Sequence, residues 1–206
     1  AKTGHTFFNP LSHVYVPAGH KIYDKNQFGF ITRWKVQSLD LIKEGLTHGW
    51  SLEQIKRSIK RVLREEYSKL LNNELPLTDL VKTRVLSKDP EWYFQKSLPV
   101  RVAEEKNEKA CQRGEPKQFT QGDVVKAGFD ARDGEVIANE FREPGISSYN
   151  KVIKNHLYYP VLSGLFWPRA HEKGRQYTKQ ANKNFFSMLQ RKPRVKKKRT
   201  LREFFS

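Results

Sequence analysis

The segment from residue 51 to residue 71 constrains the fold more than any other stretch of this sequence. Ser51 and Gln54 form a capping-box pattern, which is typical of a helix N-terminus. Asn72-Asn73 and Pro76 supply the corresponding stop signals. Between them, apolar residues follow the 3.6-residue period of a helix: Leu52, Ile55, Ile59, Val62, Leu63, Tyr67, Leu70 and Leu71. We therefore expect a long amphipathic helix with one side in a core.

The opposite side of this helix is basic, as is the chain as a whole. Its cations are Lys56, Arg57, Lys60, Arg61, Arg64 and Lys69, and each of them alone is most simply interpreted as a solvated surface residue. The chain has a net charge of +17, and residues 169–206 hold 13 of its 39 Lys and Arg but 2 of its 22 Asp and Glu. This distribution favours nucleic acid as a partner, although an anionic membrane, an acidic protein or a localisation receptor could use the same charge.

The remaining periodicities alternate between helix and strand. Helices are expected over 36–48, 100–111 and 149–166, the last with a kink at Pro160. Short strands are expected over 13–16, 28–31, 80–85, 124–128 and 135–138, and Asp133-Gly134 indicates a hairpin between the last two. Residues 169–200 are polar and basic and are expected to form a flexible linker. The pattern predicts a helix-rich α+β fold.

Composition excludes several kinds of protein. Cys111 is the only cysteine, so neither an intrachain disulfide nor a cysteine-based zinc or iron–sulfur site can form. No apolar run is long enough to span a bilayer, and residues 1–5 do not lead into a signal sequence. We expect an intracellular protein of a reducing compartment, with no membrane partner.

Three segments, in order, resemble the thumb of family B DNA polymerases. The first runs from Leu75-Pro76-Leu77-Thr78-Asp79-Leu80-Val81-Lys82 to Leu86-Ser87-Lys88-Asp89-Pro90-Glu91-Trp92-Tyr93. The second is Lys96-Ser97-Leu98-Pro99-Val100-Arg101-Val102-Ala103, followed by Gly122-Asp123-Val124-Val125. The third runs from Ser148-Tyr149 to Tyr159-Pro160-Val161-Leu162. Departures from the family pattern include Val100 where a His is usual and Arg33-Trp34-Lys35 where "R-R-D" often opens the thumb.

The resemblance implies a division of the chain into three parts. Residues 1–34 would be a short β segment associated with the palm, residues 35–168 a thumb-like DNA-binding domain with small β hairpins, and residues 169–206 a disordered basic linker ending in a clamp-binding peptide. Because the chain starts without Met, we expect a processed or excised piece. The thumb-like segments and the clamp-like end imply the small polypeptide of a split archaeal or viral polymerase or an excised thumb fragment. In an archaeon it would lie in the cytoplasm or nucleoid.

A thumb holds duplex primer–template DNA without reading its sequence, which is a task for cations that contact phosphates. The resemblance places five cations in loops that face the minor groove: Lys82, Arg84, Lys88, Lys96 and Arg101. Each could also be an ordinary surface charge.

The last residues resemble a sliding-clamp-binding peptide, "Q-x-x-apolar-x-x-F-F". Leu201 takes the apolar position, Phe204 and Phe205 take the aromatic pair, and Lys198 replaces the usual Gln. One helical turn would bring the three apolar side chains to one side, where they could enter one hydrophobic pocket. Phe185-Phe186 lacks the apolar residue three positions earlier.

The polymerase motifs that carry metal-bound carboxylates, "D-x-x-S-L-Y-P" and "D-T-D-S", do not occur in this chain. Asp130 and Asp133 are the nearest pair, and they look like loop residues. The sequence therefore predicts no catalytic residue and no cofactor here, with Mg²⁺ and nucleotidyl transfer belonging to a separate catalytic polymerase chain. The alternative is a basic RNA- or ribosome-binding structural protein. A metal-free DNA-binding accessory factor is a weaker third option.

Overall fold

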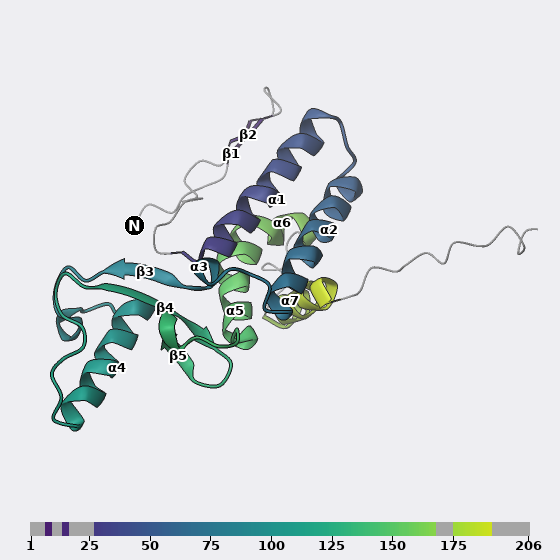
Figure 1. Cartoon of the computed structure of the whole chain (residues 1–206). Helices are drawn as coiled ribbons and strands as arrows, with labels where there is room; N and C mark the ends of the chain where they lie inside the picture. Colours follow the sequence, from purple (N-terminus) through teal and green to yellow (C-terminus); the bar gives the residue numbers. More distant parts are fainter. Residues whose placement is uncertain (1–6, 10–13, 17–26, 168–174, 191–206) are drawn as a thin grey trace, which may run out of the picture.

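The computed structural model describes residues 7–9, 14–16, 27–167 and 175–190. These residues form a helix-rich α+β structure in two adjoining parts (Figure 1). We call the first part the helical body; it contains α1 (Gly29–Thr47), α2 (Leu52–Leu71), α3 (Leu77–Leu80) and all helices after residue 145. We call the second part the sheet lobe; it contains the three-stranded sheet and α4 (Leu98–Gln112).

The helical body is organised around α1 and α2. Ser51 Oγ accepts a hydrogen bond from Gln54 N at 3.3 Å, and Gln54 Oε1 accepts one from Ser51 N at 2.7 Å, so the predicted capping box is confirmed. Ile55, Ile59 and Leu63 point into the core. The core is rich in aromatic rings, which together with the aliphatic residues remove a large apolar area from water.

The long helix after the sheet changes its winding around Pro160. It begins as α5 (Ile146–Ile153), continues as a π-helical stretch, η3 (Lys154–Leu162), and ends as α6 (Ser163–Phe166). Pro160 lies in the π-helical stretch. Since proline has no N–H and clashes with the preceding turn of an α-helix, the wider winding accommodates it.

The sheet lobe is an antiparallel meander covered on one side by a helix. The strands β3 (Lys82–Val85), β4 (Val124–Asp130) and β5 (Gly134–Ile137) lie in the order β3-β4-β5, and β4 and β5 form the predicted hairpin across residues 130–134. Helix α4 packs on one side of the sheet (Figure 1). Short 3₁₀ turns, η1 (Pro90–Trp92) and η2 (Ala138–Glu140), complete the lobe.

Tyr149 joins the two parts. Its ring is fully buried, and its hydroxyl donates to Leu80 O at 2.6 Å and accepts from Phe129 N at 3.1 Å. A side chain at Gly128 would come within 2.8 Å of Leu80 O and 3.1 Å of Tyr149 Oη. Glycine therefore permits the close approach of β4 to the end of α3 at this junction.

The N-terminal part of the structure differs from the prediction around the start of α1. Residues 28–31, predicted as a strand, lie at the start of α1, and the expected boundary between residues 34 and 35 falls inside that helix. Phe30, Ile31 and Trp34 are fully buried and share a helical face, so tertiary packing decides the conformation. Strands β1 (Phe7–Asn9) and β2 (Val14–Val16) form an antiparallel pair before it.

The C-terminal prediction also needs a correction. Residues 175–190, expected to belong to a flexible linker, form helix α7 (Arg175–Gln190), which packs on α2. Ala181, Phe185, Met188 and Leu189 are buried at spacings of four, three and one residues, which suit one helical face. The polar and basic composition of the segment hid this pattern.

Candidate nucleic-acid interface

The loop between β3 and α4 folds around the side chain of Tyr93. Tyr93 Oη accepts a hydrogen bond from Ser87 N at 2.7 Å and lies 3.0 Å from Ser87 Oγ. Arg84 and Lys88 lie over its ring, with the guanidinium carbon and Nζ at 4.9 Å and 5.1 Å from the ring centre. The six-residue separation of Ser87 and Tyr93 thus closes a loop that presents two cations. We call residues 84–97 the Tyr93 loop.

Two more of the predicted cations lie where this loop enters α4, and both are paired with carboxylates. Lys96 pairs with Glu104, and Arg101 binds Glu135 of β5 with Nε and Nη2. Arg101 Nη1 also donates to Lys96 O at 3.1 Å. The hydrogen bonds that Arg101 donates to Glu135 raise the pKa of Arg101, so this guanidinium is firmly held in its charged form.

The remaining predicted residue, Lys82, lies two residues before Arg84 on the same face of β3, with Nζ 4.9 Å from the centre of the Phe28 ring. The structure therefore gathers four of the five predicted cations at the Tyr93 loop and the start of α4. The fifth stands at the junction with the helical body.

Two exposed aromatic residues in the Tyr93 loop escaped the sequence reasoning. Phe94 is 99% exposed and Trp92 is 71% exposed, whereas Tyr93 between them is buried. Large exposed rings next to cations are typical of surfaces that contact nucleic acid, since rings stack on bases or enter grooves while cations contact phosphates. The signal was the run of three aromatic residues, Trp92-Tyr93-Phe94, shortly after the break at Asp89-Pro90.

The sheet side opposite α4 is open near this loop. Val85 of β3 pairs with Val124 of β4, and they are 59% and 55% exposed. Thr83 and Lys126, the next such pair on this side, are exposed too. This side offers a weakly charged surface beside the Tyr93 loop.

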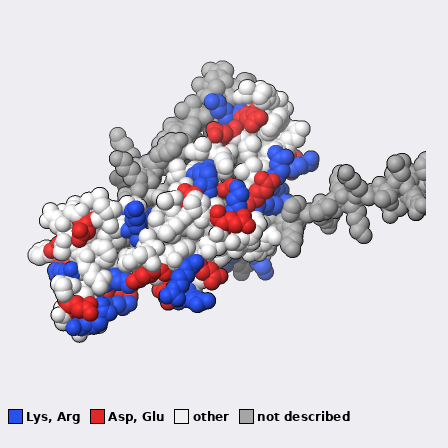
Figure 2. Space-filling view, in the orientation of Figure 1, with Lys and Arg blue, Asp and Glu red and all other residues white. Residues whose placement is uncertain are grey.

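Acidic residues interrupt the basic surface of the sheet lobe. On the face shown in Figure 2, Asp and Glu lie among Lys and Arg over the lobe, and the described cations do not merge into one positive wall. The ion pairs Lys96–Glu104, Arg101–Glu135, Lys106–Glu140 and Lys109–Glu105 explain this mixture. Of the predicted residues, Arg84 and Lys88 form no ion pair with any described residue.

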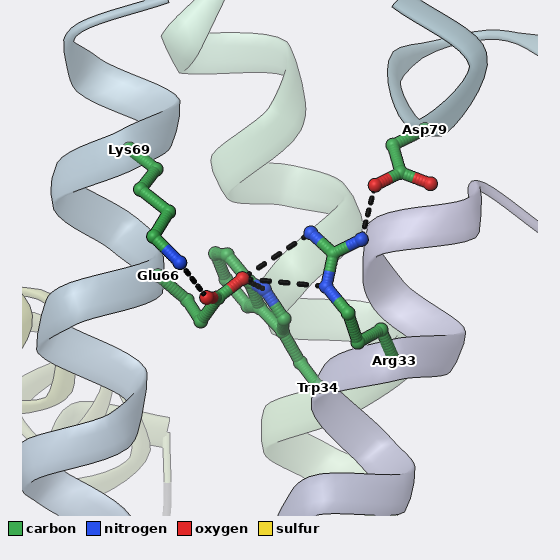
Figure 3. A network of polar contacts seen from close by, with 5 residues as sticks. All are labelled: Arg33, Trp34, Glu66, Lys69 and Asp79. Carbon is green, nitrogen blue, oxygen red and sulfur yellow. Dashed lines mark hydrogen bonds and ion pairs between the residues drawn. The ribbon is translucent and has the colours of Figure 1, made fainter. Parts of the chain in front are cut away.

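Arg33 has a structural role, as Figure 3 shows. Its guanidinium contacts Asp79 of α3 and donates from Nη2 to Glu66 of α2 at 3.2 Å. Trp34 Nε1 and Lys69 Nζ donate to the same Glu66 carboxylate at 3.1 Å and 2.6 Å. Burial raises the pKa of Glu66, but the hydrogen bonds from Lys69 and Trp34 outweigh it and lower the pKa overall. The network ties together three helices where the family pattern would have "R-R-D".

Asp130 also has a structural role. Its carboxylate accepts hydrogen bonds from the backbone N–H groups of Arg132, Asp133, Arg142 and Glu143, at 2.8–3.3 Å. The N–H groups of Glu143 and Arg142 contribute most to holding the pKa of Asp130 well below its usual range. The described residues contain no cluster of three or more His, Cys, Asp or Glu that could hold a metal ion.

The predicted clamp-binding residues, Lys198, Leu201, Phe204 and Phe205, lie outside the described residues. Phe185 is fully buried in the core of the helical body. Among the helices that the structure describes, none has both the length and the apolarity needed to cross a bilayer.

No protein-family model matches this chain, and no curated protein matches it either.

Proposed function

We propose that this chain is a non-catalytic, thumb-like part of a family B DNA polymerase, which holds primer–template duplex while a separate catalytic chain performs nucleotidyl transfer. In this proposal the Tyr93 loop contacts the duplex, with Arg84 and Lys88 on phosphates and Phe94 toward the bases. The C-terminal residues bind a sliding clamp and so tether the polymerase to DNA.

The observation that supports the proposal best is the closed Tyr93 loop. Its sequence, Leu86-Ser87-Lys88 followed by Tyr93, resembles the thumb pattern. The Ser87–Tyr93 hydrogen bonds give that spacing a physical purpose, because they hold the ring over which Arg84 and Lys88 lie, and Arg84 Nη1 also donates to Ser97 Oγ at 3.1 Å. Cations held in this way lose less side-chain entropy when they bind a phosphate.

Duplex binding can be measured by the fluorescence anisotropy of a labelled 20-base-pair DNA over a series of salt concentrations. Each lost phosphate contact should reduce the slope of log affinity against log salt by about 0.9. The double variant Arg84→Gln/Lys88→Gln should therefore bind more weakly with a smaller slope. Lys43→Gln, an exposed cation of α1, is the matched control and should leave both unchanged.

The polymerase assignment itself needs the catalytic chain. Primer extension by that chain, with a sliding clamp present, should become more processive when this chain is added. Deletion of residues 199–206 should remove clamp capture and leave duplex affinity largely in place. Unchanged processivity would contradict the proposal, and tighter binding of structured RNA than of duplex DNA would favour the alternative RNA-binding function.

A further inference from the structure

A pocket of about 300 Å³ lies in the helical body, between α2, the end of α6 and the end of α7. Lys56, Lys60 and Arg64 line it from α2, together with Glu53, and Phe166 and Trp167 line it at the end of α6. The three cations are spaced four residues apart, so they form one row on the helix. The pocket thus combines a basic wall with aromatic rings.

Arg64 is fixed in place with its outer nitrogens available. Its Nε donates to Met188 O, in the last turn of α7, at 2.7 Å. Neither Nη atom forms a hydrogen bond or an ion pair with a described residue. A guanidinium held by Nε presents its remaining N–H groups as a fork, which suits two oxygens of one phosphate.

Lys60 adds a second cation, which forms no ion pair with a described residue. Its Nζ lies 5.5 Å from the centre of the Phe166 ring. Lys56 differs, because it pairs with Glu53 at 3.0 Å. The hydrogen bond from Lys56 contributes most to lowering the pKa of Glu53, and the charge of Lys60 lowers it further.

The aromatic side of the pocket is also held by packing. Trp167 packs edge-on against Tyr158 and Phe185, with ring centres 5.8 Å and 6.5 Å apart. Its neighbour Phe166 lies 5.6 Å away at an angle of 37°. Both rings are half-buried, so part of each stays accessible. A planar ligand could stack there without displacing the core.

We propose that this pocket binds a nucleotide unit, with the phosphate at Arg64 and Lys60 and the base against Trp167 and Phe166. The volume is at the small end for ligand pockets and suits one nucleotide. A simple anion would gain nothing from the rings, and a neutral aromatic ligand would gain little from the cations. The unit can come from a free mononucleotide or from a single strand of nucleic acid. This site is independent of the duplex contact at the Tyr93 loop.

The source of the nucleotide can be determined with three probes. Anisotropy of a labelled ten-nucleotide oligo(dT) measures strand binding, and competition with adenosine monophosphate and with inorganic phosphate measures the smaller ligands. We expect the strand to bind, and adenosine monophosphate to compete at least tenfold better than phosphate. Equal competition by the two small ligands would reduce the site to an anion site and overturn the proposal. A failure of all three probes to bind would also overturn it.

Variants locate the binding. Lys60→Ala and Trp167→Leu should each weaken oligo(dT) binding at least fivefold. Arg57→Ala, an exposed cation one position from the row on the same helix, is the matched control and should change it less than twofold. Circular dichroism verifies folding. Equal effects of Lys60→Ala and Arg57→Ala would show general charge attraction instead of a site.

The same variants separate this proposal from that of duplex binding. Arg84→Gln/Lys88→Gln should weaken duplex binding and leave oligo(dT) binding at the pocket within twofold. Lys60→Ala should do the reverse. If oligo(dT) binding is lost in the Tyr93-loop variant and kept in Lys60→Ala, the strand binds at the loop, and the pocket proposal is wrong.

Discussion

The helical body and the sheet lobe are stabilised in different ways. One large core fills the body, where Phe28, Phe30, Trp34 and Tyr149 lie in contact, and it extends to Leu98, Val102 and Ala127 at the edge of the lobe. The lobe has a small core of five buried residues: Leu86, Tyr93, Val100, Ala103 and Val125. Its loops depend on polar side chains, such as Asn107, which exchange hydrogen bonds with the backbone. The body is therefore expected to resist changes of pH and salt that loosen the lobe.

The largest predicted effect is in the body. Phe30→Ala removes a fully buried ring that packs on Trp34 and Tyr149 at 5.1 Å and 5.7 Å. Deleting such a ring leaves a cavity, so the free energy of unfolding should fall by about 3–5 kcal/mol. Urea denaturation checks this. Leu46→Ala on the same helix, 40% exposed, is the control, and a similar loss there would contradict this account of the body.

A smaller effect, which depends on pH, is expected in the lobe. Asp130→Asn removes the charge that four backbone N–H groups surround, and should cost roughly 2 kcal/mol at neutral pH. The pKa of Asp130 is lowered in the folded state. Its contribution to the free energy of unfolding is therefore complete above the unfolded pKa of about 4, and it is lost as the pH falls below that value.

The measurement is urea denaturation between pH 7 and pH 3. The difference in the free energy of unfolding between the native chain and Asp130→Asn should stay constant above about pH 5 and become smaller below pH 4. Asp133→Asn, in the same turn but exposed, should show no such gap. A gap that widens on acidification would contradict the assigned role of Asp130.

These predictions also show how far the sequence could lead. The capping box and period of α2 were enough to place that helix, because Ser51 and Gln54 are neighbours whose geometry is local. The prediction of a strand over residues 28–31 was wrong, because these β-forming residues lie at the start of a helix in which they are buried. Local propensity is weaker than the burial of three large side chains.

The candidate site shows the same limit. The spacing of Ser87 and Tyr93 was visible, and it closes a loop. The pairing of Arg101 with Glu135 joins residues 34 apart in the chain, and no local pattern reveals such a contact. The pocket between Arg64 and Trp167 depends on the docking of α7, which the polar composition of that segment concealed.

A smaller change tests the Tyr93 loop. Tyr93→Phe keeps the ring and removes the hydroxyl that accepts from Ser87 N. Water can reach the exposed Ser87, so the loss should be about 0.5–1.5 kcal/mol. The affinity for duplex DNA should fall even though most of the protein stays folded. Without its hydroxyl the ring is no longer held in place, so Arg84 and Lys88 lose their fixed positions. Unchanged duplex binding by a folded Tyr93→Phe would show that the loop geometry is irrelevant to DNA.

The smallest effect distinguishes a paired cation from an available one. Arg101 is held by Glu135 at the surface of the lobe, and exposed ion pairs contribute about 1 kcal/mol or less to stability. Glu135→Gln should therefore change the unfolding free energy little. The substitution frees a guanidinium beside the Tyr93 loop, so the affinity for duplex DNA should rise. The slope of log affinity against log salt should grow by up to about 0.9, which corresponds to one phosphate contact.

The control is Glu108→Gln, which makes the same change in net charge. Glu108 is an exposed carboxylate of α4 whose side chain pairs with no described cation. An equal gain in both variants would mean that DNA responds to the overall charge of the lobe, and Arg101 would then have no place in the interface.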